Sequence, residues 1–249
     1  MPDTPTPDTL LAFDTSTERM ALAVQTAGGR WLDDAEGGAA ASAALLPALQ
    51  ALLARAGRVM ADVAAIGFGR GPGAFTGLRT SCAVAQGLAF GLARPALPVD
   101  SLMLVAEQAR QQAGGGDGFE VAVAMDARMG EVYAARYRHA GAVDGRWQVL
   151  QAPCLWSPQA LAACWAADAP PAATGSALGL FADTLGAACP RSRWIDAGTA
   201  RAAALVVLAD RAWRDGAGVD AAEALPLYLR DKVAQTTAER MALRAAEAR

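Results

Sequence analysis

The residues best suited to chemistry lie in a glycine-rich stretch and in two turns that each open with an aspartate. Four glycines fall within the nine residues from Gly69 to Gly77, between an apolar run and a long apolar-periodic segment. Glycine admits positive φ and close approach to the backbone, so the pattern predicts a strand, a tight loop and a helix with Thr76 as N-cap. Such a loop points backbone N–H groups outward, which suits a phosphate or another anion.

The two familiar phosphate fingerprints do not match this loop. A dinucleotide-binding G-x-G-x-x-G that starts at Gly71 requires a third glycine at position 76, where the chain has Thr76. A P-loop requires a glycine followed by lysine, and the one lysine of the chain is Lys232. A plain tight turn between strand and helix is therefore the alternative to an anion cradle.

The first aspartate turn follows a buried apolar run that ends at Asp14. The hydroxyl residues Thr15 and Ser16 come next, and a second apolar run follows, which predicts a hairpin. Asp126 ends an apolar run in the same way, and both patterns resume six to seven residues later. This similarity predicts a duplicated α/β unit. The hairpins could face a phosphate or Mg²⁺; the alternative is an Asx or ST turn that bonds nearby backbone.

Composition narrows the function classes. The 249 residues fit one large domain or two small ones, and the net charge of −3 argues against a generic nucleic-acid surface. No uncharged apolar run approaches the length of a transmembrane helix, so we expect no membrane span. The acidic, proline-rich start lacks the basic and apolar regions of a signal peptide, which predicts a disordered lead-in to a cytoplasmic protein.

Cysteine and histidine usage gives no metal-binding or triad pattern. The single histidine, His139, lies among polar residues, and the four cysteines show no C-x-x-C pair. We therefore expect a surface histidine, four reduced and mostly buried thiols, and no bound metal. The cysteines are Cys82, Cys154, Cys164 and Cys189.

The remaining periodicities define an order of elements. Strands are expected at 10–14, 20–25, 30–32, 63–68, 121–125, 132–135 and 172–174, with a meander over 136–150. Helices are expected at 39–56, 77–93, 102–112, 158–166, 175–189 and 199–214. The glycine cluster at 114–118 predicts the boundary between two units. The predicted divisions are a lead-in at 1–9, a first lobe at 10–113, a second lobe with C-terminal helix and tail at 114–234, and a frayed tail at 235–249.

Four blocks of this chain resemble the TsaB (YeaZ) family and occur in the family's order. They are residues 13–17, 69–79 with 85–89, 125–133 and 225–230, so the resemblance spans about residues 10–234. The resemblance implies an α/β protein of the actin-like ATPase (sugar kinase/Hsp70/actin) fold with two ribonuclease-H-like lobes. That expectation agrees with the duplicated aspartate hairpins.

The resemblance also implies a function in tRNA modification. TsaB-like proteins are non-catalytic subunits that act with TsaD and TsaE. TsaD transfers the threonylcarbamoyl group from threonylcarbamoyl-AMP to N6 of the adenosine after the anticodon, in tRNAs that read codons beginning with A. TsaD binds its metal through histidines on a first-lobe helix, and the matching helix at 39–56 has none; where many relatives carry a histidine, this chain has Ala41, followed by Ser42.

For partners and cofactors the resemblance implies docking on TsaD through first-lobe helices, and contact with tRNA that is indirect or through the complex. For the free protein it leaves two alternatives, a homodimer and a monomer. No cofactor of its own is expected, and ATP or ADP only within the partner complex. The helices at 39–56 and 77–93 are candidates for the partner face; their apolar residues fit an ordinary core equally well.

Two sets of site residues follow. A partner-interface or signature loop is expected at Arg70, Gly71, Pro72, Gly73, Phe75, Thr76, Gly77 and Arg79. Phosphate-facing hairpins are expected at Asp14, Thr15, Ser16 and Asp126. The alternative function is a stand-alone actin-like ATP-binding enzyme, a kinase or ATPase, with Asp14 and Asp126 as Mg²⁺ or base carboxylates. The lack of metal ligands argues against a peptidase.

Overall fold

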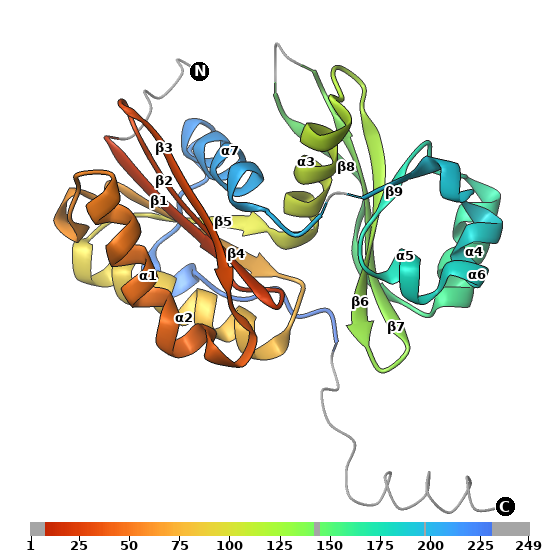
Figure 1. Ribbon diagram of the computed structural model, residues 1–249, viewed down its shortest axis with the longest axis horizontal. Helices are drawn as coiled ribbons and strands as arrows, with labels where there is room; N and C mark the ends of the chain where they lie inside the picture. The colour runs from red at the N-terminus through yellow and green to blue at the C-terminus, as the bar shows by residue number, and fades with distance from the viewer. Residues whose placement is uncertain (1–7, 142–144, 197, 231–249) are drawn as a thin grey trace, which may run out of the picture.

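The computed structural model describes residues 8–141, 145–196 and 198–230. The expected lead-in up to residue 7 and the frayed tail at 235–249 lie outside these residues. Within the described ranges, ten strands form two five-stranded sheets, and helices cover both faces of each sheet (Figure 1). Short 3₁₀ turns join the elements at Gly38–Ala40, Met60–Asp62, Arg191–Arg193 and Ala221–Glu223.

The first sheet has the strand order β3-β2-β1-β4-β5. Its central strand β1 pairs antiparallel with β2 and parallel with β4, and β5 extends the parallel side. Alternate residues of β1 point to opposite faces, so Leu11 and Phe13 pack under α1 and α2 while Leu10 and Ala12 pack under α7. The strands are β1 (Thr9–Asp14), β2 (Arg19–Thr26), β3 (Gly29–Glu36), β4 (Ala65–Gly71) and β5 (Ala96–Asp100); the helices are α1 (Ala41–Arg55), α2 (Phe75–Leu92) and α7 (Ala202–Arg214).

The second sheet repeats this topology with the order β10-β9-β6-β7-β8. Its central strand β6 is again antiparallel to one neighbour and parallel to the other. The strands are β6 (Glu120–Arg128), β7 (Glu131–His139), β8 (Trp147–Trp156), β9 (Ala173–Thr174) and β10 (Trp194–Ile195); the helices are α3 (Ser101–Ala113), α4 (Pro158–Ala167), α5 (Ala177–Leu180) and α6 (Ala182–Ala188). The duplicated unit and the two ribonuclease-H-like lobes of the actin-like fold are thereby confirmed.

Two helices pack across the expected lobe boundary. The helix at 199–214, expected in the second lobe, is α7 and packs on the first sheet through side chains such as Leu205 and Ala209. Helix α3 follows the first sheet in sequence, but Leu102 and Ala106 pack against the second (Figure 1). The division at residue 114 is therefore wrong for these two helices. The glycine cluster there separates two elements along the sequence, but it does not determine on which sheet a neighbouring helix packs.

Other differences are local. Strand β5 was missed, because Pro95 and Pro98 resemble helix stops whereas the strand runs through Pro98 beside β4. The helix expected at 175–189 is divided into α5 and α6 at Phe181. His139 is buried rather than on the surface, since its ring packs 5.2 Å from that of Trp147.

The thiols divide into two kinds. Cys82 and Cys189 are buried, Cys164 is half-buried and Cys154 is exposed, so only part of the expected burial is confirmed. All four are free thiols. Burial and the nearby charge of Asp14 raise the pKa of Cys82 to about 12, which keeps this thiol protonated and unreactive at neutral pH.

Within the described residues, one segment, Gly38–Arg55, is long and apolar enough to cross a membrane by length and composition. It contains α1, whose leucines Leu45, Leu49 and Leu52 are buried in the core of the first lobe. A helix that packs into a protein core passes the same test of length and composition. The outer face of α1 is therefore the feature that requires an explanation.

Candidate functional site

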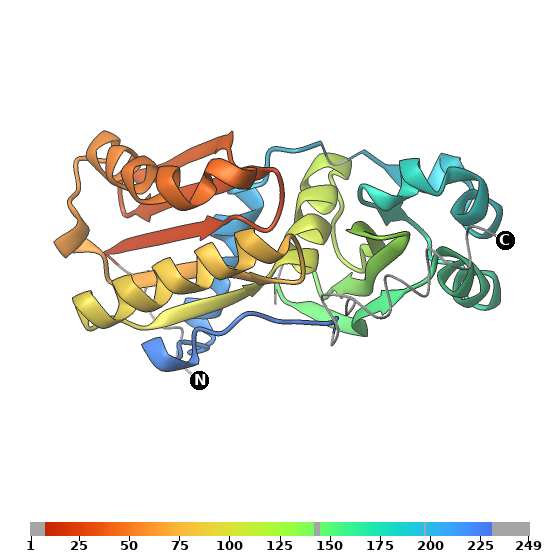
Figure 2. The same cartoon turned by 90° about the horizontal axis from the view of Figure 1, so that it is seen from below.

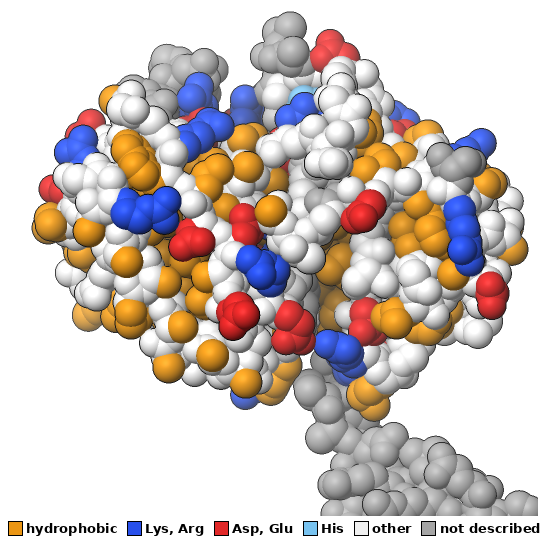
Figure 3. Space-filling model, in the orientation of Figure 1, with side chains coloured by type: hydrophobic (Ala, Val, Ile, Leu, Met, Phe, Trp, Pro, Cys, Tyr) orange, Lys and Arg blue, Asp and Glu red, His pale blue; other side chains and the backbone are white. Residues whose placement is uncertain are grey.

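The candidate site is a cleft of about 1060 Å³ between the two lobes. Both aspartate turns line it, together with the glycine-rich loop, helix α3 and the segment that ends at Arg230. The space-filling view shows the hollow running down between the lobes (Figure 3). Of the residues that the sequence marks for chemistry, the cleft is lined by Ser16, Pro72, Gly73, Phe75 and Asp126.

Asp14 lies at the base of this cleft but is fully buried. One carboxylate oxygen, Oδ1, accepts hydrogen bonds from the backbone N–H and the hydroxyl of Ser16, at 2.9 and 2.6 Å. The other, Oδ2, accepts from the Ser101 hydroxyl at 2.6 Å. Burial acts to raise the pKa of Asp14, but Arg201 and the bonds from Ser101 and Ser16 outweigh it and hold the pKa below its usual range. The carboxylate is therefore ionised and bonded on both oxygens.

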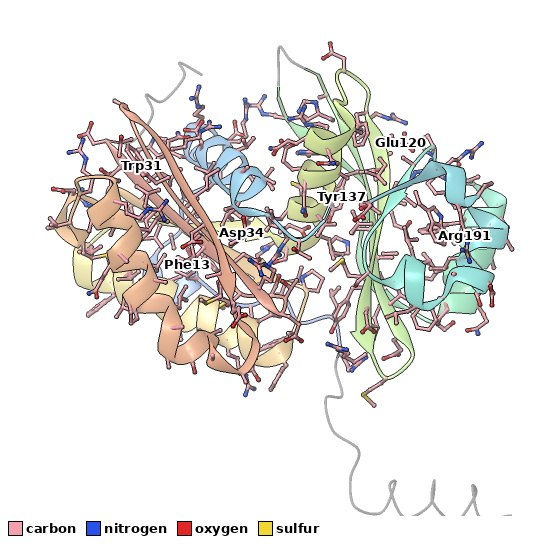
Figure 4. All side chains as sticks on the ribbon, viewed as in Figure 1. Phe13, Trp31, Asp34, Glu120, Tyr137 and Arg191 are labelled. Atoms are coloured by element: carbon pink, nitrogen blue, oxygen red, sulfur yellow. The ribbon has the colours of Figure 1, made fainter. Side chains whose placement is uncertain are left out.

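Arg201 is the residue of this site that sequence reasoning missed. Its Nη1 donates to Asp14 Oδ1 at 2.9 Å, and its side chain is almost completely buried. Asp34 fixes the backbone here, since its carboxylate accepts from the N–H groups of Arg201 at 2.6 Å and Ala202 at 3.2 Å, at the start of α7 (Figure 4). An arginine before an apolar helix gives no sequence signal for a partner 187 positions away.

The glycine-rich loop is shaped by this turn. The Thr15 hydroxyl donates to the carbonyl of Gly77 at 2.6 Å, and the N–H of Ala74 donates to the carbonyl of Ser16 at 2.8 Å. A Cβ at Gly77 would lie 1.9 Å from the Thr15 carbonyl oxygen, and one at Gly73 would lie 2.6 Å from Ser16. The glycines therefore allow two backbone segments to touch, as a close helix–hairpin contact requires.

The helix after the loop starts earlier than the sequence suggests. Helix α2 begins at Phe75 with Ala74 at its N-cap, so the prediction that Thr76 is the N-cap is wrong. The side chains of Phe75 and Arg79 instead form a surface stack with Tyr228. The Arg79 guanidinium lies 3.8 Å from the centre of the Phe75 ring, and its Nε donates to the Tyr228 hydroxyl at 3.2 Å.

Residues 225–230 form a strap between the lobes (Figure 2). In the first lobe, the N–H of Leu227 donates to the carbonyl of Arg70 at 2.7 Å. In the second lobe, the Arg230 guanidinium donates to the carbonyl of Ala127 at 3.2 Å and pairs with Glu131. The strap therefore ties the glycine-rich loop to the second aspartate turn.

A second link between the lobes runs through Tyr137 of β7, which points towards the first lobe (Figure 4). Its hydroxyl donates to Asp100 Oδ2 at 2.9 Å, and the other oxygen of Asp100 caps α3 by accepting from the N–H of Leu102 at 2.8 Å. Burial raises the pKa of Asp100, and the positive charge of Arg70 opposes that rise. This hydrogen-bonded pair fixes the start of α3 against the second sheet.

The second aspartate turn is more open. Asp126 Oδ1 accepts from the N–H of Arg128 at 2.8 Å, so the local geometry resembles that of Asp14 and Ser16. Its carboxylate also pairs with the guanidinium of Arg128 at 3.3 Å. Arg128 reaches across the cleft to Glu18 at 3.2 Å. Both turns are therefore Asx turns that bond nearby backbone, which was the structural alternative for each.

The actin-like fold implies a nucleotide with Mg²⁺ between such turns, and the residues around Asp14 do not fit one. The carboxylate is bonded within the chain on both oxygens, and the N–H groups of Ala74 and Gly71 are already donated to Ser16 and Ser101. Among the described residues, no group of three or more His, Cys, Asp or Glu side chains is arranged to hold a metal ion. Phosphate contact by Asp14, Thr15, Ser16 and Asp126 stays an untested prediction.

Comparison with known proteins gives consistent matches. A family model described as TsaD, tRNA N6-adenosine threonylcarbamoyltransferase, matches residues 37–162. The tRNA threonylcarbamoyladenosine biosynthesis protein TsaB of Haemophilus influenzae is 39% identical over 125 residues, which cover 50% of this chain and 52% of that protein. The Escherichia coli protein of the same name is 38% identical over 115 residues, which cover 46% and 48%. The match thus spans about half the length of these curated relatives.

A solved structure extends the match to most of the chain. YeaZ from Pseudomonas aeruginosa is 36% identical, with a TM-score of 0.75, and the alignment covers 89% of this chain and all of that one. The structural match therefore includes both lobes and the cleft between them.

Proposed function

Because this chain belongs to the TsaB (YeaZ) family, we propose that it is a non-catalytic subunit in the biosynthesis of threonylcarbamoyladenosine in tRNA. In this proposal it docks on TsaD and acts with TsaE. TsaD transfers the threonylcarbamoyl group from threonylcarbamoyl-AMP to N6 of the adenosine after the anticodon. The chain supports that transfer as a scaffold.

The observation that carries the proposal is the apolar outer face of α1 and α2. These helices bury one side in the first core and expose small or apolar residues on the other (Figure 3). Phe90 is 83% exposed and Leu46 is 41% exposed. The neighbouring exposed positions on the two helices are Ala43, Pro47, Ala51, Ala83 and Gly87. Small residues around large apolar anchors suit close packing against helices of a partner.

The start of α2 extends this face. The stack of Phe75, Arg79 and Tyr228 is partly exposed at the end of α2 that borders the cleft. Aromatic and arginine side chains are the residues most often found at binding hot spots. We therefore include Phe75 and Arg79 in the partner surface, and propose that Arg70, Gly71, Pro72, Gly73, Thr76 and Gly77 hold its shape.

The residues of the chain support a non-catalytic role. Helix α1 carries no histidine, and Ala41, at the position where many relatives have one, is buried. Asp14, the carboxylate that an actin-like ATPase would need, is bonded within the chain. We propose that ATP or ADP enters only with the partner complex, that tRNA is contacted through the complex, and that the protein works in the cytoplasm.

The same apolar face fits a second copy of the chain when TsaD is absent. A homodimer and the TsaD complex would then bury the same helices and exclude each other. Adding TsaD to the free protein should therefore convert any dimer into a heterodimer without forming a larger assembly.

The test uses full-length protein with TsaD, TsaE, tRNA and threonylcarbamoyl-AMP. We expect Phe90→Arg to weaken TsaD binding by about 2 kcal/mol, or roughly 30-fold in Kd, because it places a charge in an apolar contact. Val149→Arg is the matched control, since Val149 is 48% exposed on β8 of the second lobe and does not line the cleft. Binding is measured by calorimetry, and modified nucleoside by mass spectrometry.

If Phe90→Arg binds TsaD and supports modification as well as Val149→Arg does, this face is not the docking surface. If the unsubstituted protein neither binds TsaD nor is needed for modification, the scaffold function is wrong. Arg70→Ala and Arg79→Ala proteins that fold, bind and support full modification would restrict the loop to a structural role.

A further inference from the structure

The guanidinium of Arg201 has no role in the proposed docking surface, yet it is buried at the base of the cleft and donates four hydrogen bonds there. It is 3% exposed. It enters from residues 198–201, where the chain crosses from β10 of the second lobe to α7 of the first. A buried charge on a crossing segment is costly unless its partners are well placed.

Its partners all come from the first aspartate turn. Nη1 donates to Asp14 Oδ1 at 2.9 Å and to the Ser16 hydroxyl at 3.3 Å. Nη2 donates to the Thr17 hydroxyl at 2.8 Å and to the carbonyl of Arg19 at 3.0 Å. The guanidinium is thus held by a carboxylate, two hydroxyls and a backbone carbonyl.

These acceptors have the chemistry of a cation site. Carboxylate, hydroxyl and carbonyl oxygens are the donors that hard cations prefer, and they converge here on one positive group. The four oxygens come from a single tight turn. They match the planar guanidinium, whose two terminal nitrogens can each donate to separate acceptors. A lysine ammonium could not reproduce this pattern from the same backbone position.

We propose that residues 14–19 form a cation-binding site that the chain fills with its own Arg201. The internal guanidinium takes the place that a metal-bound phosphate would need at this turn. Arg201 is therefore the residue that excludes such a ligand from the first lobe. Arg201 lies on the segment that crosses between the lobes. Its ion pair with Asp14 therefore also fixes the path of the chain at this crossing.

The proposal predicts chemical rescue of Arg201→Ala by guanidinium. Removal of the side chain leaves Asp14 buried without its counter-charge, so we expect the melting temperature to fall by about 10 °C. Guanidinium chloride at about 20 mM, far below denaturing concentrations, should restore roughly half of that loss. Urea at the same concentration is the neutral control of equal shape and should restore none.

Two further proteins make the result specific. Arg201→Ala with Asp14→Asn removes both charges, so guanidinium should leave its melting temperature unchanged. Arg201→Lys keeps a positive charge and should fold even if Arg201→Ala does not, with a melting temperature between those of the unsubstituted protein and Arg201→Ala. Salt controls use sodium chloride at matched ionic strength.

Manganese tests whether the site excludes metal. The electron paramagnetic resonance signal of free Mn²⁺ falls when the ion binds to protein. With or without ATP, the unsubstituted protein should lower this signal no more than Asp14→Asn does. Rescue of Arg201→Ala by guanidinium or Mn²⁺, lost in the double variant, supports the proposal. Equal rescue by urea, rescue that persists without Asp14, no rescue by either cation, or Asp14-dependent Mn²⁺ binding by the unsubstituted protein would overturn it.

Failure of this test is distinct from failure of the scaffold function. Docking on TsaD is read from the outer face of α1 and α2, which Arg201 does not touch. If the unsubstituted protein binds TsaD normally but Arg201→Ala is rescued by neither guanidinium nor Mn²⁺, only the inference about Arg201 is contradicted.

Discussion

Asp14 and Asp126 lie near the ends of the two central strands, and each accepts a backbone hydrogen bond from the residue two positions later. From that shared geometry the two turns diverge. Asp14 is fully buried and is bonded by Arg201 and Ser101, which come from distant parts of the chain. Asp126 keeps 16% of its side chain exposed and pairs with Arg128 of its own turn.

The difference shows how a duplicated unit can retain a local structure while changing its use. Both turns keep the Asx bond, because it depends only on the aspartate and the backbone beside it. Only the first turn lies where the crossing segment and the glycine-rich loop meet, so only its aspartate is fully buried at the lobe junction. The second turn still borders the open cleft.

The largest effect expected from this comparison is on stability. Asp14→Ala should lower the free energy of unfolding by about 4 kcal/mol, because it leaves the buried Arg201 guanidinium without a counter-charge. Asp126→Ala loses one turn hydrogen bond at a partly exposed site and should cost about 1 kcal/mol. Urea unfolding followed by circular dichroism measures both. Equal losses of unfolding free energy in the two variants would show that the two aspartates contribute equally to stability.

The next comparison uses glycines beside the turns. A Cβ at Gly77 would meet the Thr15 carbonyl oxygen at 1.9 Å, so Gly77→Ala must push backbone from backbone and should cost about 3 kcal/mol. Gly130 has a φ of +74° with open space around it, so Gly130→Ala carries only the cost of a left-handed backbone, about 1 kcal/mol. If the Gly130 variant is the less stable, close approach is not what the loop glycines provide.

These turns also show what the sequence could predict. Apolar runs and turn residues gave the hairpins, helix α1 and the duplication, because alternation and local turn chemistry are recorded within a few residues. Thr76 looked like an N-cap because its type fits, but contact of the loop with Thr15 and Ser16 sets the helix start at Phe75 instead. Local propensity gives way to tertiary packing there.

The ion-pair partner of Asp14, Arg201, could not be predicted from local sequence patterns. Arg201 and Asp14 are 187 positions apart and meet only because α7 returns to the first sheet. That return also reversed the expected lobe for α7. The strap at 225–230 was recognised as a family block, but its connection of Arg70 to the second turn depends on the three-dimensional path of the chain.

Acid sensitivity separates the buried turn from the rest of the molecule. The bonds of Asp14 hold its pKa below the ordinary value of 3.8, so ionised Asp14 stabilises the fold above that pH. This contribution should be lost progressively as the pH falls below 3.8 and through the lower pKa of the folded state. Asp14→Asn should therefore be less stable than the parent at neutral pH, and the difference should shrink as the pH falls through this range. A gap that stays constant in urea titrations across these pH values would contradict the assignment.

The smallest effect is expected where the two turns touch. Glu18 and Arg128 pair at 3.2 Å across the cleft, but their side chains are 75% and 73% exposed. Water and salt screen such a pair, so a double-mutant cycle with Glu18→Ala and Arg128→Ala should give a coupling below about 0.5 kcal/mol. Raising the salt concentration should reduce it further, since exposed charges are screened over a few ångströms at high ionic strength. A coupling well above about 1 kcal/mol would mean that the pair of Glu18 and Arg128 holds the two lobes together at the mouth of the cleft. The second turn would then be as constrained as the first.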